Sequence, residues 1–319
     1  MKQDKIKELI ELAEESFKCK VNIGDSEELR LNRVSTGIPP LDKILKGGFK
    51  RGGFHLIVGQ FATGKTFMAQ KAIEFIQKQD GIAVLIDAER RYDPDWFKLT
   101  GVDISKLIVF RPNTGEQACD SMITFVKQDV DLIVIDSFAA LLPLAEEEEG
   151  MEQQFIGLQS RMLNKMFRKV VPINSNTVII ATNQLRQDIG GTWGRGVQQR
   201  IVGGLGQLYY ASLILETRRK EWILEKKQRV GFTIECFVSK CNYAPPFQSC
   251  KIPFNFYKGQ LDVLSSLIDL AIDVGIIKQS GPYYEYSGFN RKLRGREEIS
   301  SWFNEEQDRI EKLKQEILI

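Results

Sequence analysis

The eight residues "GQFATGKT" at positions 59–66 place two glycines, a lysine and a threonine at the spacing G-x-x-x-x-G-K-T. They follow the apolar run "FHLIV" and precede "FMAQKAIEFIQ", which has helical periodicity. Glycines let the backbone curl so that successive N–H groups face phosphates, and the following helix N-terminus adds positive potential. The Lys65 amino group can reach the outer phosphates, and the Thr66 hydroxyl can ligate magnesium. The predicted nucleotide-binding loop comprises Gly59, Gln60, Phe61, Ala62, Thr63, Gly64, Lys65 and Thr66.

Two acidic residues follow apolar runs that read as neighbouring strands. Asp136 ends "VDLIVID" and precedes Ser137, at the usual place of the carboxylate that holds magnesium. Thr66 and Asp136 are therefore the predicted metal ligands. Glu89 in "IDAER" ends another strand on the same edge and is the predicted catalytic carboxylate for hydrolysis. Asp87 competes for this role, with a structural N-cap or a buried polar partner as its alternative.

These residues require a sheet to position them. Apolar runs such as "FHLIVG", "IAVLIDAE", "LIVF", "LIVIDS" and "TVIIATNQ" alternate with amphipathic helices, which predicts an α/β fold with a mostly parallel sheet covered on both faces. After residue 212, "SLILE", "WILEKK" and "GFTIECFVSK" predict antiparallel strands at one edge. From about residue 265, a helix, a "YYEY" hairpin and a closing helix predict a small α/β module. The run "EEEE" at 146–149 predicts a solvated loop or a helix start.

Composition excludes several other functional classes. With 43% hydrophobic and 27% charged residues and a net charge of +2, the 319-residue chain predicts a soluble, cytoplasmic protein with no membrane partner. Its first 17 residues indicate an amphipathic helix, not a signal peptide. The five cysteines lack C-x-x-C spacing, so we expect reduced packing residues. His55, the only histidine, lies in an apolar run, which argues against histidine-based metal or serine-triad catalysis.

The motifs together resemble the RecA family of DNA recombinases over roughly residues 35 to 310. The resemblance rests on "STGIPPLD", "GQFATGKT", "IDAERRYDP", "TGEQA", "DLIVIDSFAALLP", "IGLQSRMLNKMFRK", "TNQLR", "YAS", "APPF" and "SGPYYEYSG". It implies a RecA-like ATPase core at 35–262 with two DNA-binding loops, preceded by an oligomerisation arm and linker at 1–34. A small C-terminal α/β domain follows at 263–319.

The resemblance also assigns roles around ATP and Mg²⁺. Glu89 matches the family's catalytic carboxylate, and Asp93 and Trp96 fall where the family contacts and stacks the adenine. Gln184 matches the residue that senses the terminal phosphate and opens the second DNA-binding loop. Lys240 matches a lysine that the adjacent subunit places across the bound ATP. The catalytic set implied is Glu89, Lys65, Gln184 and Lys240.

The segment "GGTWGRGVQQRIVGG" at 190–204 lies in that second loop. Its glycines keep the backbone adaptable, while an indole ring and guanidinium groups suit unpaired bases and phosphates, at about 1 to 3 kcal/mol per stacked base. On the helix before it, Arg161 and Arg168 are seven residues apart and share one face. The alternative is a disordered linker with incidental arginines and solvated helix charges. The DNA-binding residues implied are Arg161, Arg168, Arg186, Ile189, Trp193, Arg195, Arg200, Gly203 and Gly204.

The resemblance gives the N-terminal arm a partner, a second copy of the chain. In the family, such an arm packs its helix and an edge strand onto the neighbouring subunit of a helical filament, and Val21 and Ile23 of "KVNIG" suit that strand. Docking on its own core is the alternative. Two positions depart from the bacterial pattern, because Asn242 and Leu208 stand where lysines face the neighbour's ATP. Fewer cations there should slow hydrolysis, unless a metal ion or another basic residue substitutes.

The function implied is an ATP-dependent homologous recombinase that polymerises on single-stranded DNA and exchanges strands with a homologous duplex. Two alternatives stay open at the level of sequence. A helicase or branch-migration motor of the same core fold would normally need an extra domain. A filament scaffold that protects single strands, with vestigial ATP turnover, fits the altered Asn242 and Leu208 positions.

Overall fold

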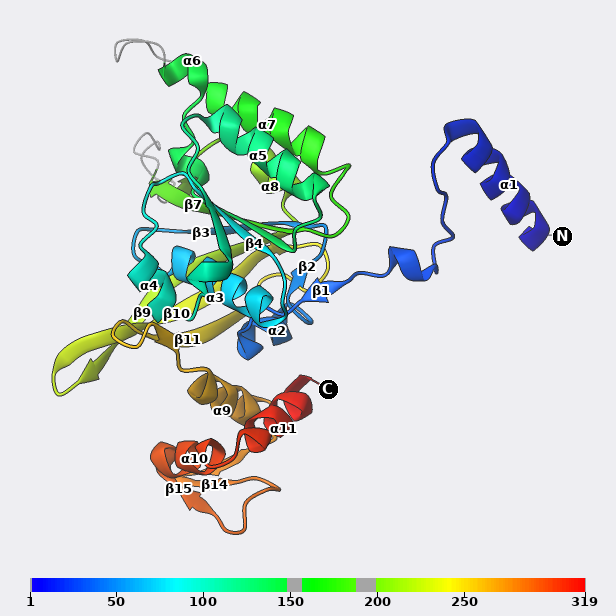
Figure 1. Ribbon diagram of the computed structural model, residues 1–319. Helices are drawn as coiled ribbons and strands as arrows, with labels where there is room; N and C mark the ends of the chain where they lie inside the picture. Colours follow the sequence, from blue (N-terminus) through cyan, green and yellow to red (C-terminus); the bar gives the residue numbers. More distant parts are fainter. Residues whose placement is uncertain (1, 148–156, 188–198, 319) are drawn as a thin grey trace, which may run out of the picture. The chain divides into compact units, whose positions relative to one another are not determined.

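The computed structural model describes residues 2–147, 157–187 and 199–318 (Figure 1). The chain divides into two units, Met1–Asn32 and Arg33–Ile319. The first unit holds the predicted amphipathic helix, α1 (Lys2–Phe17), and a short 3₁₀ turn, η1 (Glu27–Leu29). The second unit begins with β1 (Arg33–Val34), which pairs antiparallel with β2 (Phe49–Lys50).

A mixed sheet forms the centre of the second unit, with the strand order β12-β11-β10-β9-β3-β7-β6-β4-β5. The strands from β9 to β5 along this order run parallel, and β10, β11 and β12 extend the sheet antiparallel at the β9 edge, as predicted. The strands are β3 (Phe54–Gly59), β4 (Ala83–Asp87), β5 (Leu107–Phe110), β6 (Leu132–Asp136), β7 (Val178–Gln187), β9 (Leu213–Glu225), β10 (Gln228–Cys241), β11 (Ser249–Asn255) and β12 (Gln260–Leu261).

Helices cover both faces of this sheet (Figure 1). Side chains of one strand alternate between two cores, so Ile57 packs with one helix layer while Leu56 and Val58 pack with the other. The first layer contains α2 (Pro39–Ile44), α3 (Lys65–Lys78) and α4 (Pro94–Leu99), and the second α5 (Gly115–Lys127), α7 (Leu158–Val170) and α8 (Gly206–Tyr210). The connections include η2 (Ile104–Lys106), η3 (Phe138–Ala140) and α6 (Leu144–Glu147), which ends with the first two residues of the acidic run.

The C-terminal module has a core of its own, in which Leu267, Ile268 and Phe303 are fully buried. The predicted "YYEY" hairpin is part of a three-stranded antiparallel sheet. The module consists of α9 (Val263–Asp273), β13 (Lys278–Ser280), β14 (Tyr283–Glu285), β15 (Leu293–Arg294), α10 (Gly295–Asn304) and α11 (Gln307–Leu318).

Two predicted stretches differ in the structure, and a third stays a prediction. "KVNIG" pairs with no strand in the described part of the chain, so its expected pairing with a neighbouring copy is not tested by one chain. The glycine-rich stretch does contain a strand, β8 (Gln199–Ile201), which pairs antiparallel with the end of β7. The "SLILE" and "WILEKK" runs are one strand, β9, which turns through left-handed Lys226 and Lys227 into β10 (Figure 1).

His55 is a packing residue, as predicted, and so are the buried Cys119 and Cys236, whereas Cys19 is exposed. The His55 ring is fully buried, its Nε2 accepts from the Lys50 N–H, and burial lowers its pKa to about 3. All five cysteines are free, and Cys236 lies opposite Cys250 across β10 and β11. Among the described residues, no helix has the length and apolarity that a membrane crossing requires.

Candidate nucleotide-binding site

The phosphate loop connects β3 to α3, as the motif predicts. Its backbone turns through left-handed conformations at Ala62 and Gly64. The Thr63 hydroxyl donates to the Gln60 carbonyl oxygen at 2.9 Å and lies 2.9 Å from the Thr217 hydroxyl, which fixes the loop to β9. A Cβ atom at Gly59 would lie 2.6 Å from the Thr217 carbonyl oxygen. Glycine is therefore required where the loop leaves β3.

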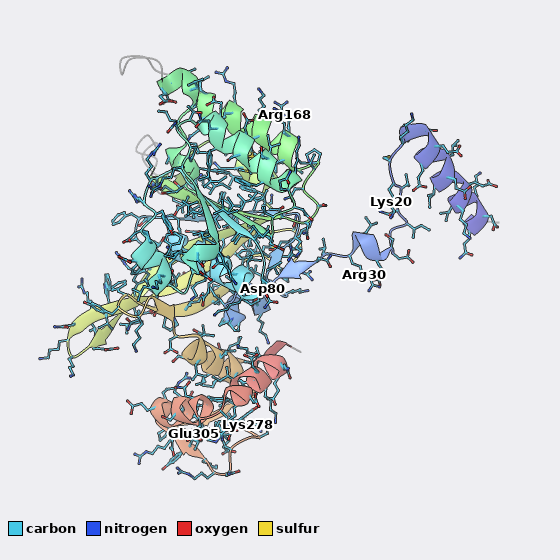
Figure 2. All side chains as sticks on the ribbon, in the orientation of Figure 1. Lys20, Arg30, Asp80, Arg168, Lys278 and Glu305 are labelled. Carbon is cyan, nitrogen blue, oxygen red and sulfur yellow. The ribbon has the colours of Figure 1, made fainter. Side chains whose placement is uncertain are left out.

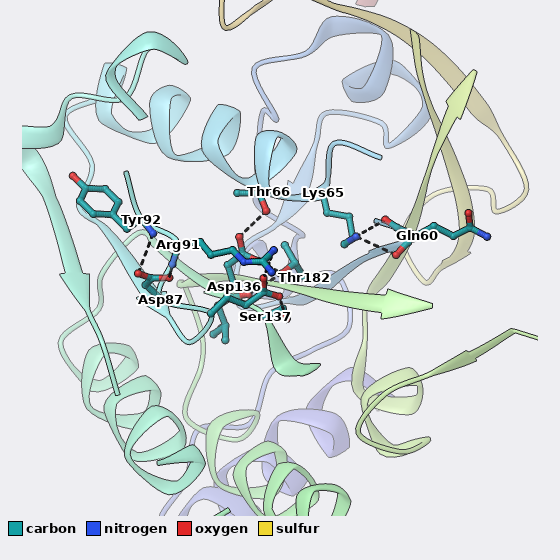
Figure 3. Close-up of polar contacts among 12 residues, drawn as sticks. Gln60, Lys65, Thr66, Asp87, Arg91, Tyr92, Asp136, Ser137 and Thr182 are labelled. Atoms are coloured by element: carbon teal, nitrogen blue, oxygen red, sulfur yellow. Dashed lines mark hydrogen bonds and ion pairs between the residues drawn. The ribbon is translucent and has the colours of Figure 1, made fainter. Parts of the chain in front are cut away.

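Lys65 begins α3 and folds back over the loop (Figure 3). Its Nζ donates to the carbonyl oxygens of Gly59 at 3.1 Å and Gln60 at 2.6 Å. Burial lowers the pKa of Lys65, while the neighbouring carboxylates of Asp136 and Glu89 oppose that shift. The ammonium group thus lies in the concave side of the loop, where phosphate oxygens would compete with the two carbonyls for its protons.

Thr66 and Asp136, the predicted metal ligands, lie together (Figure 3). The Thr66 hydroxyl donates to Asp136 Oδ2 at 2.7 Å, and the Thr182 hydroxyl donates to Oδ1 at 2.5 Å. Burial raises the pKa of Asp136 against these hydrogen bonds. Within the described ranges, no cluster of three or more His, Cys, Asp or Glu residues could hold a metal ion. One carboxylate and one hydroxyl fit Mg²⁺, which keeps water and binds phosphate oxygens at its other positions.

Glu89 and Asp87 have different surroundings. Glu89 Oε1 accepts from the Ser137 hydroxyl at 2.6 Å, Oε2 pairs with Arg91 at 2.9 Å, and the side chain lines the cavity. Asp87 is only 3% exposed and accepts from the N–H groups of Arg91 and Tyr92 and from Arg111 Nε. Its oxygens are therefore occupied in holding the turn after β4, whereas Glu89 is the one of the two carboxylates that lines the cavity.

A cavity of about 360 Å³ opens beside the loop, and Glu89, Trp96, Asp136 and Gln184 line it. Its apolar side is made by Phe232, Phe254 and Phe256, with Trp96 edge-on to Phe254 at a centroid distance of 6.5 Å. Sequence reasoning did not identify these three phenylalanines, although the alternation in "GFTIECFVSK" marks Phe232 as inward-facing. Such a wall suits a flat aromatic base.

Five residues predicted for the nucleotide site do not line this cavity, namely Gly59, Gln60, Asp93, Ser137 and Lys240. Asp93 caps α4, because its Oδ1 accepts from the Asp95 N–H at 3.1 Å. Gln60 lines a second cavity on the other side of the loop. Lys240 is the penultimate residue of β10, and its Nζ donates to the carbonyl oxygens of Leu208 at 2.7 Å and Tyr209 at 3.0 Å. The structure therefore brings Lys240 and Leu208 together at the end of α8, apart from this chain's own phosphate loop.

The predicted DNA-binding residues lie at the α7 face and the second loop. Arg161 and Arg168 are exposed on α7, and Figure 2 labels Arg168 there. Gly203 and Gly204 are left-handed, and a Cβ at Gly204 would collide with Ser160 of α7. Arg186 of β7 lies opposite Arg200 of β8 in the ladder that brackets residues 188–198. Ile189, Trp193 and Arg195 lie outside the described residues.

Comparison with known proteins places these features in one family. Residues 5–261 match the RecA N-terminal domain, and residues 265–318 match the RecA C-terminal domain. The chain is 36% identical over 300 residues to Protein RecA of Trichormus variabilis, covering 93% of this chain and 83% of that protein. It is 37% identical to Protein RecA of Mycoplasma mycoides over 92% of this chain and 86% of that one, and 37% identical to that of Chlorobaculum parvum over 92% and 84%. The chain therefore belongs to the RecA family of recombinases, the proteins of homologous recombination and DNA repair.

Proposed function

We propose that this protein is a DNA-dependent ATPase that polymerises on single-stranded DNA and exchanges the strand with a homologous duplex. The observation that carries the proposal is the position of Gln184. Its side chain lines the cavity beside the phosphate loop. Its strand, β7, continues directly into the ladder with β8 that brackets residues 188–198. A displacement of Gln184 by a bound nucleotide would therefore act on the second loop through residues 185–187 of the same strand.

In this proposal ATP lies on the phosphate loop with its base against the phenylalanine wall. Thr66 and Asp136 would hold Mg²⁺, which neutralises charge on the phosphates when bound. Glu89 orients the attacking water and accepts its proton, and the Ser137 hydroxyl, 2.6 Å away, fixes the carboxylate. The Lys65 ammonium leaves the Gly59 and Gln60 carbonyls for phosphate oxygens.

Filament growth uses the first unit and an open sheet edge. In α1, the side chains of Leu9, Leu12 and Phe17 are 55%, 60% and 74% exposed, which leaves apolar surface for a partner. β5 is the last strand of the central sheet, so one of its edges offers backbone donors and acceptors to an added strand. Val21 and Ile23 of a neighbouring copy supply that strand in this proposal.

The subunit interface explains where Lys240 acts. Its ammonium rests on the end of α8 in the single chain and would reach a neighbour's phosphate only by leaving two carbonyls. Leu208 and Asn242 add no charge there, so the trans contribution to hydrolysis rests on fewer cations. Slow turnover with normal filament assembly is the behaviour that this arrangement favours.

A strand-exchange assay with ATP and with a non-hydrolysable analogue, combined with electron microscopy of the products, tests the function. We expect extended helical filaments and joint molecules in both nucleotides, with release of the DNA only in ATP. Closed rings that unwind a duplex directionally would indicate a helicase or branch-migration motor instead. Filaments that coat DNA without exchanging strands would indicate a protective scaffold.

A further inference from the structure

Two buried amide side chains join β7 to the segment that closes the second loop. Asn183, the residue before Gln184, is fully buried, and Gln207 in the first turn of α8 is 1% exposed. Asn183 Nδ2 donates to Gln207 Oε1 at 2.7 Å. This contact spans 24 residues of sequence and encloses the whole second loop.

The hydrogen bonds of this pair use every amide proton. Asn183 Nδ2 also donates to the Val202 carbonyl oxygen at 2.8 Å, and Gln207 Nε2 donates to the carbonyl oxygens of Val202 at 2.5 Å and Gly204 at 2.9 Å. Asn183 Oδ1 accepts from the Gln184 N–H at 2.8 Å. Turning either amide over would place N–H groups against each other, so each orientation is fixed.

The network connects the cavity to the loop by a route separate from the β7–β8 ladder. At one end is the backbone of Gln184, which stands in register with Gly59 of the phosphate loop and whose side chain lines the cavity. At the other end are Val202 and Gly204, the last residues of the glycine-rich stretch. An apolar side chain at position 207 would fill the same space but would donate no hydrogen bond to the Val202 or Gly204 carbonyl oxygen.

We propose that Gln207 is a positioning residue that, through Asn183, transmits occupancy of the nucleotide cavity to the closing end of the second loop. This inference rests on the proposed function, since it concerns how nucleotide controls DNA binding. A shift of the Gln184 backbone moves the Asn183 amide toward or away from Gln207. Gln207 then moves with it and displaces Val202 and Gly204, whose carbonyl oxygens it binds. Gln207 touches neither nucleotide nor DNA in this account.

The test compares the affinity for fluorescent oligo-dT, measured by anisotropy, with and without a non-hydrolysable ATP analogue. We expect Gln207→Leu to reduce the nucleotide-induced gain in affinity about tenfold, because it removes two donors from the network. Affinity without nucleotide, and affinity for the analogue itself, should stay within about twofold. A purely structural defect would weaken binding in both conditions and leave their ratio intact.

Gln77→Leu is the matched control. Gln77 is a buried glutamine at the far end of α3, and its amide bonds both backbone groups of Asp103. It should lower stability and leave the nucleotide-induced gain unchanged. A Gln207→Leu gain equal to that of the wild type would overturn the inference, whereas a wild-type protein with no gain would overturn the proposed function instead.

Hydrogen exchange on the wild-type protein gives a second test that does not depend on how the variant folds. Adding the analogue without DNA should change the protection of amides in residues 202–211, since Gln207 anchors both α8 and the Gly204 carbonyl. Unchanged protection there, with protection gained at the phosphate loop, would contradict the inference.

Discussion

Glu89→Gln and Asp87→Asn should have opposite effects, although the two carboxylates are two residues apart. In Glu89→Gln the amide oxygen can still accept from Ser137, and the lost ion pair is with Arg91, whose side chain is 79% exposed. The Glu89 side chain is only 14% exposed, but because its cationic partner is solvated the pair contributes about 1 kcal/mol, and the melting temperature should fall by about 3 °C. ATP hydrolysis, in contrast, should fall by about 10² to 10⁴.

Asp87→Asn removes a buried carboxylate that accepts from three donors. Asp87 Oδ1 accepts from the Arg91 N–H, while Oδ2 accepts from the Tyr92 N–H and Arg111 Nε. Either orientation of an asparagine amide places its NH₂ group against at least one of these donors. The expected loss of stability is about 2 to 4 kcal/mol, with hydrolysis per folded molecule largely kept.

Phosphate release in the presence of oligo-dT and thermal unfolding of the same samples measure both effects. The reasoning fails if Glu89→Gln hydrolyses ATP within about threefold of the wild type. It also fails if Asp87→Asn abolishes hydrolysis while melting at the wild-type temperature.

Three further predictions concern the loop, the DNA face and the core. Lys65→Ala should abolish nucleotide-dependent filament formation, seen by electron microscopy, and intact filaments would contradict the phosphate-loop assignment. Arg161→Ala with Arg168→Ala should weaken oligo-dT binding and reduce its salt slope by about 0.7 per lost phosphate contact; an unchanged slope would remove α7 from the DNA interface. Because burial lowers the pKa of His55 to about 3, the unfolded state binds the extra proton as the pH falls below about 6.5. Stability should therefore decrease toward acid by about 1.4 kcal/mol per pH unit from this residue, and in His55→Leu that part of the slope should vanish in denaturant titrations at pH 4 to 7.

The sequence predicts the phosphate loop, Asp136 and Glu89 because a motif, a strand end and helical periodicity coincide at each. The sequence does not predict the phenylalanine wall. No local pattern shows that β10 and β11 lie near the phosphate loop, because their position depends on the order of strands in the sheet. The sequence does not predict β8, because its three residues lie in a glycine-rich stretch and form a strand only by pairing with the end of β7. The sequence also does not predict the hydrogen bond between Asn183 and Gln207, because neither residue belongs to a motif and only the fold shows that both are buried and in contact.

The arm illustrates the opposite case. Val21 and Ile23 have strand-like alternation, yet they form no strand in the described chain, since an edge pairing depends on a partner. The sequence can therefore indicate that the segment suits strand pairing, but a single chain lacks the neighbouring copy with which it would pair.

The central claim is that nucleotide in the cavity beside Gln184 decides whether the second loop binds unpaired DNA. The most direct measurement is the dissociation constant for oligo-dT with and without a non-hydrolysable ATP analogue, for the wild type and for Lys65→Ala. The account predicts tighter binding with the analogue for the wild type only. Equal affinity of the wild type in both conditions would contradict it.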